Sequence, residues 1–325
     1  MTACERRFSL GCVFHTDGAC FRASVNAPHD FIIGMPYVAN ASECSKASGC
    51  TKFKDGFFPR SNGFYRKHFR LPASWAAEAA AGSGSSFRLV FEGVYKVATV
   101  WVNGHYVRTY GDSSAAYTSF VVPLDAAHGL DLAGSNVIAI HVDGSYGTEH
   151  WYAGAGIYRH VWLESAPPVH AVDNGVHAPA TLAAGYASGA VAPSVELING
   201  APSASGAVGV TCTLYGPDGR VVGSQTAAHS SLPPDTPMTI KVGAIHVEKP
   251  QLWSIRTPVL YSMLTVISAA GQQRNETINT TLGFRDLQWG YATGLKTNGE
   301  RTKIRGCASA LWQHPLVLLL PLPAS

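Results

Sequence analysis

Helical periodicity is almost absent from this sequence, and short strand-like segments separated by turn residues take its place. The one stretch with good helical propensity is the alanine-rich segment at 74–82, which is too short to be stable alone. The 325 residues leave room for two cores, since one domain takes about 100 to 200 residues. We therefore expect an all-β chain with two β domains and a remainder.

Three segments of the first half have the pattern of strands. Residues 87–94 alternate between apolar and polar side chains, and residues 136–143 form a β-branched run typical of a strand buried on both faces. Residues 97–107 predict a hairpin, because Asn103 and Gly104 can both adopt the positive φ of a type I′ turn. We expect these three segments to form one sheet region.

The second half has a different spacing of strands. Residues 157–164 predict one more strand of the first domain, and the prolines at 167 and 168 end it because they lack a backbone N–H. Short strands then follow with the spacing of an immunoglobulin-like sandwich, at 194–200, 208–224, 238–247 and 260–268. The predicted division is 1–166, 167–281 and 282–325, with the last part too short for a third core.

Composition and charge exclude several classes of protein. With 46% hydrophobic and 14% charged residues the chain should fold, and its net charge of +3 is not gathered into the basic patch that nucleic acids require. The longest apolar run, LVLLL at 316–320, is too short for a membrane helix, and the N-terminus lacks the apolar stretch of a secretory signal. The seven cysteines form no CxxC pair, so no metal site is expected. Three glycosylation sequons, at Asn40, Asn275 and Asn279, leave the localisation open.

Five stretches resemble, in the same order, the front half of glycoside hydrolase family 2, the β-galactosidase and β-glucuronidase family. They are PHDF at 28–31 with GFYRKHFRLP at 63–72, FEGVYKVATVWVNGHYV at 91–107, GAGIYRHVWL at 154–163, PQLWSIRTPVLYSMLTV at 250–266, and LGFRDLQW with LKTNGERTKIRGC within 282–307. Their common order makes the resemblance specific. It implies a jelly-roll (galactose-binding-like) sugar-binding domain, an immunoglobulin-like β-sandwich and the start of a TIM barrel. The wording WYAGAGIYR favours the galactosidase branch.

The resemblance also implies where catalysis would occur. Family members use two barrel glutamates, which retain anomeric configuration when they lie about 5 to 5.5 Å apart. Neither glutamate has a position in this sequence, and Glu92, Glu149, Glu164, Glu196 and Glu248 show no spacing that would replace them. We therefore assign no catalytic residue, no metal and no cofactor, and expect the chain alone to be inactive. The Pro- and Leu-rich segment PLVLLLPLPAS stands where the resemblance implies a barrel strand. A shifted reading frame, a retained intron or a natural short form would explain this replacement.

Three residues are candidates for substrate binding, one from the resemblance and two from the chemistry of their aromatic rings. His160 occupies the polar position after the arginine of the closing strand, where β-galactosidases often carry aspartate, and it can hydrogen-bond a sugar hydroxyl. Trp151 and Tyr152 precede that strand and offer rings for the apolar face of a pyranose, with packing beneath their loop as the alternative. The expected partner is carbohydrate, a β-galactoside or related glycoside. A carbohydrate-binding module and a homo-oligomeric assembly role are the alternatives to the front part of a hydrolase.

Overall fold

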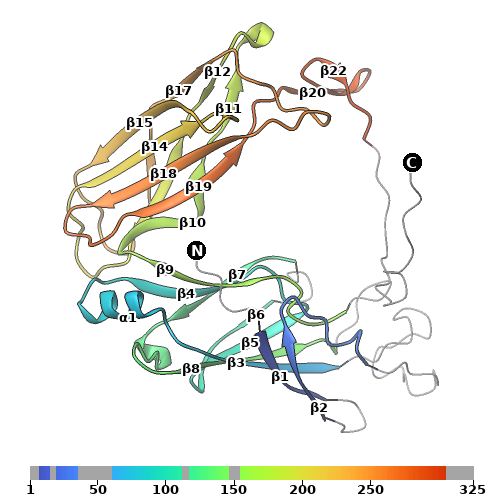
Figure 1. The fold of residues 1–325 in the computed structure, drawn as a ribbon, viewed down its shortest axis with the longest axis vertical. Coiled ribbons are helices and arrows are strands. Elements are labelled where there is room, and N and C mark those ends of the chain that lie inside the picture. The colour runs from blue at the N-terminus through green and yellow to red at the C-terminus, as the bar shows by residue number, and fades with distance from the viewer. Residues whose placement is uncertain (1–6, 15–19, 36–60, 112–116, 146–153, 305–325) are drawn as a thin grey trace.

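A computed structural model describes residues 7–14, 20–35, 61–111, 117–145 and 154–304 of the protein. Antiparallel sheets dominate it, as predicted, and they form two sandwiches that Figure 1 shows one above the other, with a small sheet beside the end of the upper one. No helix among these residues is long and apolar enough to cross a membrane.

The first sandwich packs a six-stranded sheet against a three-stranded sheet. The order β2-β1-β3-β8-β5-β6 makes the larger sheet and the order β7-β4-β9 the smaller one. Their bounds are β1 Arg7–Phe14, β2 Cys20–Asn26, β3 Asn62–Phe69, β4 Ser86–Phe91, β5 Val97–Val102, β6 His105–Tyr110, β7 Phe120–Leu124, β8 Asn136–Asp143 and β9 Val161–Ala166. The core between the sheets includes Leu89, Phe91, Val100, Ile138, Ile140 and Ile157.

Local predictions within this sandwich agree with the structure. The β5–β6 hairpin turns at Asn103 and Gly104, with φ of 48° and 85°. The predicted helix is α1 (Ala73–Ala80). In β4, Phe87, Leu89 and Phe91 are buried and the residues between them are not, as the alternation predicted.

Three expectations about this sandwich are wrong. β4 does not share a sheet with β5 and β8, because it pairs with β7 and β9 in the opposite layer. β8 is not buried on both faces, since only every second side chain reaches the core. The strand predicted at 157–164 starts only at Val161, because Gly156 has a φ of 146° and pairs with Tyr95 in an isolated bridge instead.

The second sandwich consists of three small antiparallel sheets. Their orders are β10-β13-β16, β11-β12-β17 and β15-β14-β18-β19. The bounds are β10 Val169–His177, β11 Ala180–Leu182, β12 Ser188–Val191, β13 Ser194–Asn199, β14 Val208–Tyr215, β15 Val221–His229, β16 Met238–Lys241, β17 Ile245–Glu248, β18 Tyr261–Ala269 and β19 Glu276–Leu282. The four predicted strand segments lie here, and sequence reasoning missed β10, β11, β12 and β19.

The core of the second sandwich extends beyond its last strand. Phe284 is fully buried among this core, and its ring meets that of Tyr261 edge to face at a centroid distance of 5.0 Å. Beyond it, β20 (Leu287–Gly290), β21 (Gly294–Thr297) and β22 (Glu300–Arg301) form a sheet of their own. Trp289 and Tyr291 of this region are exposed, so the small sheet adds no third core to the described part of the chain.

Candidate functional site

The segment that leads into β9 is held on both sides by backbone hydrogen bonds. Gly156 and Tyr95 exchange two of them, at 2.7 and 2.9 Å, and the N–H groups of His29 and Phe31 donate to the carbonyls of Ile157 and Ala155. Four bonds within three residues fix this stretch as firmly as a strand would. The side chains that follow, up to Trp162, therefore start from a defined backbone.

Gly156 is required at the centre of this segment. Its φ of 146° is one that side-chain-bearing residues rarely adopt. A Cβ built there would lie 2.2 Å from the carbonyl oxygen of His29 and 2.7 Å from the hydroxyl of Tyr65. The absence of a side chain at this position thus lets the two chain segments approach each other.

Polar groups beneath the segment complete its support. The Asp30 carboxylate accepts hydrogen bonds from the N–H of Ile32 at 2.9 Å and of Ala155 at 3.2 Å. His29 Nδ1 lies 3.0 Å from the Tyr65 hydroxyl. Burial raises the pKa of Tyr65 far above its usual range and lowers the pKa of His29, which the nearby Asp30 charge only partly offsets. Both rings are therefore held in their neutral forms at neutral pH, in a structural role.

His160 is half-buried, directly precedes β9 and lies beside Glu92 and Trp162. Its ring is 5.6 Å from that of Trp162 at a tilt of 56°, and its carbonyl accepts the N–H of Glu92 at 3.1 Å. The Trp162 Nε1–H donates to Glu92 Oε1 at 2.8 Å. We call Glu92, His160 and Trp162 the β9 cluster. It combines a carboxylate acceptor, an imidazole that can donate or accept, and an apolar ring.

Aromatic and cationic side chains continue the surface next to the β9 cluster. The exposed Arg159 donates to the carbonyl of Glu92 at 3.4 Å, and its guanidinium lies 5.3 Å from the centre of the Tyr158 ring. Tyr158 covers Gly93, where a Cβ would lie 2.7 Å from the ring, and it meets the exposed Tyr117 edge to face at 6.0 Å. Arg159 thus joins this segment to the loop after β4, and the rings of Tyr158 and Tyr117 stay partly accessible to solvent.

Only one of the three predicted site residues lies among the residues that the structure describes. His160 belongs to the β9 cluster, whereas Trp151 and Tyr152 lie outside the described residues. The sequence predicts a solvated or hydrogen-bonded surface position for Glu92 and a packing role for Trp162, but it does not predict that the two residues meet beside His160. A period of two through positions 160, 162 and 164 was the available signal for a shared face.

Of the glutamates weighed as possible catalytic residues, Glu92 and Glu164 are each engaged by another side chain. Glu164 accepts from Arg88 at 2.9 Å, and Arg88 also contacts Asp173 at 2.7 Å. Glu92 is engaged by Trp162, and Glu149 lies outside the described residues. Within the part of the chain that the structure describes, no three His, Cys, Asp or Glu side chains gather into a group that could hold a metal ion.

Comparison with known proteins identifies the two sandwiches. The sequence model of the glycosyl hydrolases family 2 sugar binding domain matches residues 51–167, and that of glycosyl hydrolases family 2 itself matches residues 188–285. The chain belongs to glycosyl hydrolase family 2. Its first sandwich therefore corresponds to the sugar-binding jelly roll and its second to the immunoglobulin-like domain of the family, as the resemblance implied.

Relatives of this family 2 chain include enzymes of both predicted branches. It is 28% identical over 286 residues to the β-galactosidase BoGH2A of Bacteroides ovatus, and 25% identical over 269 residues to a β-glucuronidase of Formosa agariphila. These matches cover 87% and 76% of the chain but only 30% and 26% of the relatives. A β-glycosidase structure from Bacteroides vulgatus superposes with a TM-score of 0.72 at 26% identity, over 94% of this chain and 36% of that one. The chain thus spans about a third or less of the length of these proteins.

Proposed function

We propose that this chain forms the sugar-binding and immunoglobulin-like part of a β-glycosidase that hydrolyses O-glycosidic bonds in carbohydrates, with a β-galactoside as substrate. The match to a β-galactosidase over 87% of the chain supports the β-glycosidase activity, and the segment WYAGAGIYR at 151–159 favours the galactosidase branch. The division at 1–166, 167–281 and 282–325 belongs to it, as does the assignment of the last part to the beginning of a barrel domain. The proposal includes no metal and no cofactor.

The β9 cluster is the part of the chain that contacts the sugar in this proposal. The Glu92 carboxylate is fixed by the Trp162 indole N–H, so its free lone pairs accept hydrogen bonds from two neighbouring hydroxyls without reorganisation. His160 supplies a third polar contact, and the Trp162 ring covers the apolar face of the pyranose. Trp151 and Tyr152, which precede this segment in the sequence, are proposed to contribute further rings to the same sugar.

Titration calorimetry of the purified chain with methyl β-galactoside and methyl β-glucuronide tests the cluster. We expect Glu92→Gln and His160→Ala each to weaken galactoside binding by about tenfold, the loss expected for a hydrogen bond to a charged or polar partner. Trp101→Phe is the matched control, because Trp101 is equally half-buried but lies on β5 in the opposite sheet. Equal affinities of all four proteins would remove the cluster from the proposal.

Catalysis itself is proposed to require residues other than those described. A retaining glycosidase needs two carboxyl groups about 5 to 5.5 Å apart, and Glu92 and Glu164 are engaged by Trp162 and Arg88 instead. We expect the 325-residue chain to leave p-nitrophenyl β-galactoside intact. Turnover above the buffer rate would contradict this assignment.

A carbohydrate-binding module is the second candidate, favoured by the accessible ring of Tyr117, which is 65% exposed beside Tyr158. Sugar binding with a normal calorimetric stoichiometry but no turnover by any longer form of the protein would favour this module over a hydrolase part. A homo-oligomeric assembly role is the third candidate. A strictly monomeric mass by light scattering would contradict that role.

A further inference from the structure

The connection between the two sandwiches is short and stiff. Only Pro167 and Pro168 separate β9 from β10, and both lack a backbone donor and have a fixed φ. His170 Nδ1 lies 2.9 Å and 3.1 Å from the carbonyl oxygens of these two prolines. Because carbonyl oxygens only accept, this nitrogen carries the proton and is shared between them. The imidazole thus holds the linker in one turn.

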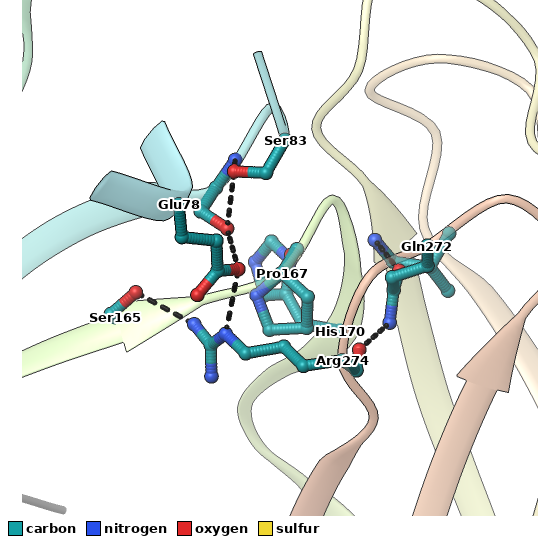
Figure 2. Close-up of polar contacts among 9 residues, drawn as sticks. Glu78, Ser83, Ser165, Pro167, His170, Gln272 and Arg274 are labelled. Atoms are coloured by element: carbon teal, nitrogen blue, oxygen red, sulfur yellow. Dashed lines mark hydrogen bonds and ion pairs between the residues drawn. The ribbon is translucent and has the colours of Figure 1, made fainter. Parts of the chain in front are cut away.

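An arginine of the second sandwich reaches across this linker into the first. Arg274 lies in the turn between β18 and β19, and Figure 2 shows its guanidinium pointing between Glu78 of α1 and Ser165 of β9. Its Nε donates to Glu78 Oε1 at 2.9 Å and its Nη2 donates to Ser165 Oγ at 2.6 Å. The hydroxyl of Ser85 donates to the same Glu78 oxygen at 2.7 Å, so the acceptor is itself fixed.

A second arginine crosses the boundary in the opposite direction. Arg88 of β4 lies directly opposite Glu164 of β9 in the strand register and donates to it at 2.9 Å. Its Nη1 lies 2.7 Å from Oδ1 of Asp173 on β10. Each sandwich therefore contributes one arginine to an ion pair with the other.

The turn that carries Arg274 is braced on the start of β10. The side chain of Gln272 accepts the N–H of Val169 at 3.0 Å and donates to the carbonyl of Arg274 at 2.7 Å, as Figure 2 shows for the second of these bonds. The Glu276 carboxylate accepts the N–H of Ala171 at 2.7 Å. These bonds within the second sandwich fix the position of Arg274 relative to the linker, independently of the contacts that Arg274 makes with the first sandwich.

We propose that Arg274 and Arg88 clamp the two sandwiches into one rigid body and so fix the direction in which the β9 cluster faces relative to the immunoglobulin-like domain. Both ion pairs are required, because the linker and a single ion pair would still allow rotation about the line that joins them. Of the two pairs that cross the boundary, Arg274–Glu78 is screened less by salt because Glu78 is only 15% exposed, whereas Arg88–Asp173 is the more screened pair because Asp173 is 48% exposed. Glu164 and Trp162 are two residues apart on β9, so their side chains lie on the same side of the strand. Glu164, which pairs with Arg88 of the clamp, is therefore the neighbour of Trp162 in the β9 cluster.

Single-molecule energy transfer between the sandwiches tests the clamp in the full chain. Dyes attached through p-azidophenylalanine at Tyr106 and Val221 report the distance, since these residues are exposed on β6 and β15. We expect one narrow distribution for the parent chain and a broad one for the double variant Arg88→Ala/Arg274→Ala. Arg220→Ala is the matched control, because Arg220 pairs with Asp218 inside a turn of the second sandwich.

A milder pair of substitutions keeps the test valid if the double alanine variant does not fold. Arg274→Lys keeps the charge but loses the fork that joins Glu78 and Ser165, and Asp173→Ala replaces a residue that is 48% exposed. We expect this pair also to broaden the distribution. A distribution that coincides with that of the parent chain, or one that broadens equally in Arg220→Ala, would overturn the clamp. Neither result depends on whether the chain binds sugar.

Discussion

Replacing Gly156 with alanine should destabilise the first sandwich strongly, for two separate reasons. The backbone strain of a side chain at a φ of 146° costs about 1 to 3 kcal/mol. The new methyl group would lie 2.2 Å from the His29 carbonyl oxygen, and the displacement needed to accommodate it adds about 1 to 3 kcal/mol. Alanine restricts the unfolded chain and returns about 0.4 to 1 kcal/mol. The net loss of unfolding free energy is therefore roughly 3 kcal/mol.

Hydrogen exchange with mass spectrometry resolves this loss by region. Amides of β3 and β8 should exchange faster in Gly156→Ala by the factor that the lost free energy sets, while those of β14 in the second sandwich keep their parent rates. Gly34→Ala is the matched control, because Gly34 has no positive φ and its nearest neighbour atom is 4.0 Å away. Rates in β3 that match those of the Gly34 variant would refute the argument that only glycine fits at position 156.

Three further predictions concern single side chains. Phe284→Ala should cost about 3 to 5 kcal/mol of stability in urea unfolding of the second sandwich, because the side chain is fully buried, whereas Trp289→Ala at an exposed position should leave the midpoint unchanged. Because burial lowers the pKa of His29 in the folded chain, the unfolded chain binds a proton at His29 at a higher pH than the folded chain does. The free energy of unfolding should therefore fall as pH drops below the ordinary histidine pKa of 6.5, and His29→Gln should reduce this pH dependence between about pH 7 and 5. An unchanged slope would contradict the burial argument. Cys212 is buried and its pKa is raised by that burial, so iodoacetamide should modify it only in denaturant, as peptide mass spectrometry would report.

Local geometry could be predicted from the sequence because it depends on residues close together in the chain. The Asn103–Gly104 turn is one case, since both residues tolerate positive φ and the flanking strands follow directly. The alternation of β4 is another. In both cases neighbouring residues carry the whole signal, so no knowledge of distant partners was needed.

Pairing between distant segments could not be predicted in the same way. β4 resembles β5 and β8 in composition, yet it joins the other sheet, because a strand with one apolar face packs equally well in either layer. The strand predicted at 157–164 begins late because Gly156 must pass close to His29, a contact between segments more than 120 residues apart. Periodicity within a segment contains no information about such an approach.

A family motif, and not the periodicity of the strand, predicts the candidate site. His160 is predicted because it follows the arginine of the closing strand, and the structure places Glu92 and Trp162 beside it. Trp162 is two residues after His160, so the period of two in a strand could have predicted that their side chains lie on the same side. Glu92 comes from the end of β4, and only the pairing of β4 with β9 places it there.

The same strand also links local strain to the orientation of the domains. Gly156 sets the start of β9, Trp162 and Glu164 alternate along its outer side, and Ser165 receives Arg274 from the second sandwich. A shift of the Gly156 segment would therefore move the β9 cluster and the clamp together, whereas loss of Arg274 would release the domain orientation and leave the cluster intact. Energy transfer in Gly156→Ala separates these cases: a distribution as narrow as that of the parent chain but at a different mean distance, with the clamp arginines unchanged, means that the backbone of β9 transmits the displacement, whereas a broadened distribution means that the clamp is released.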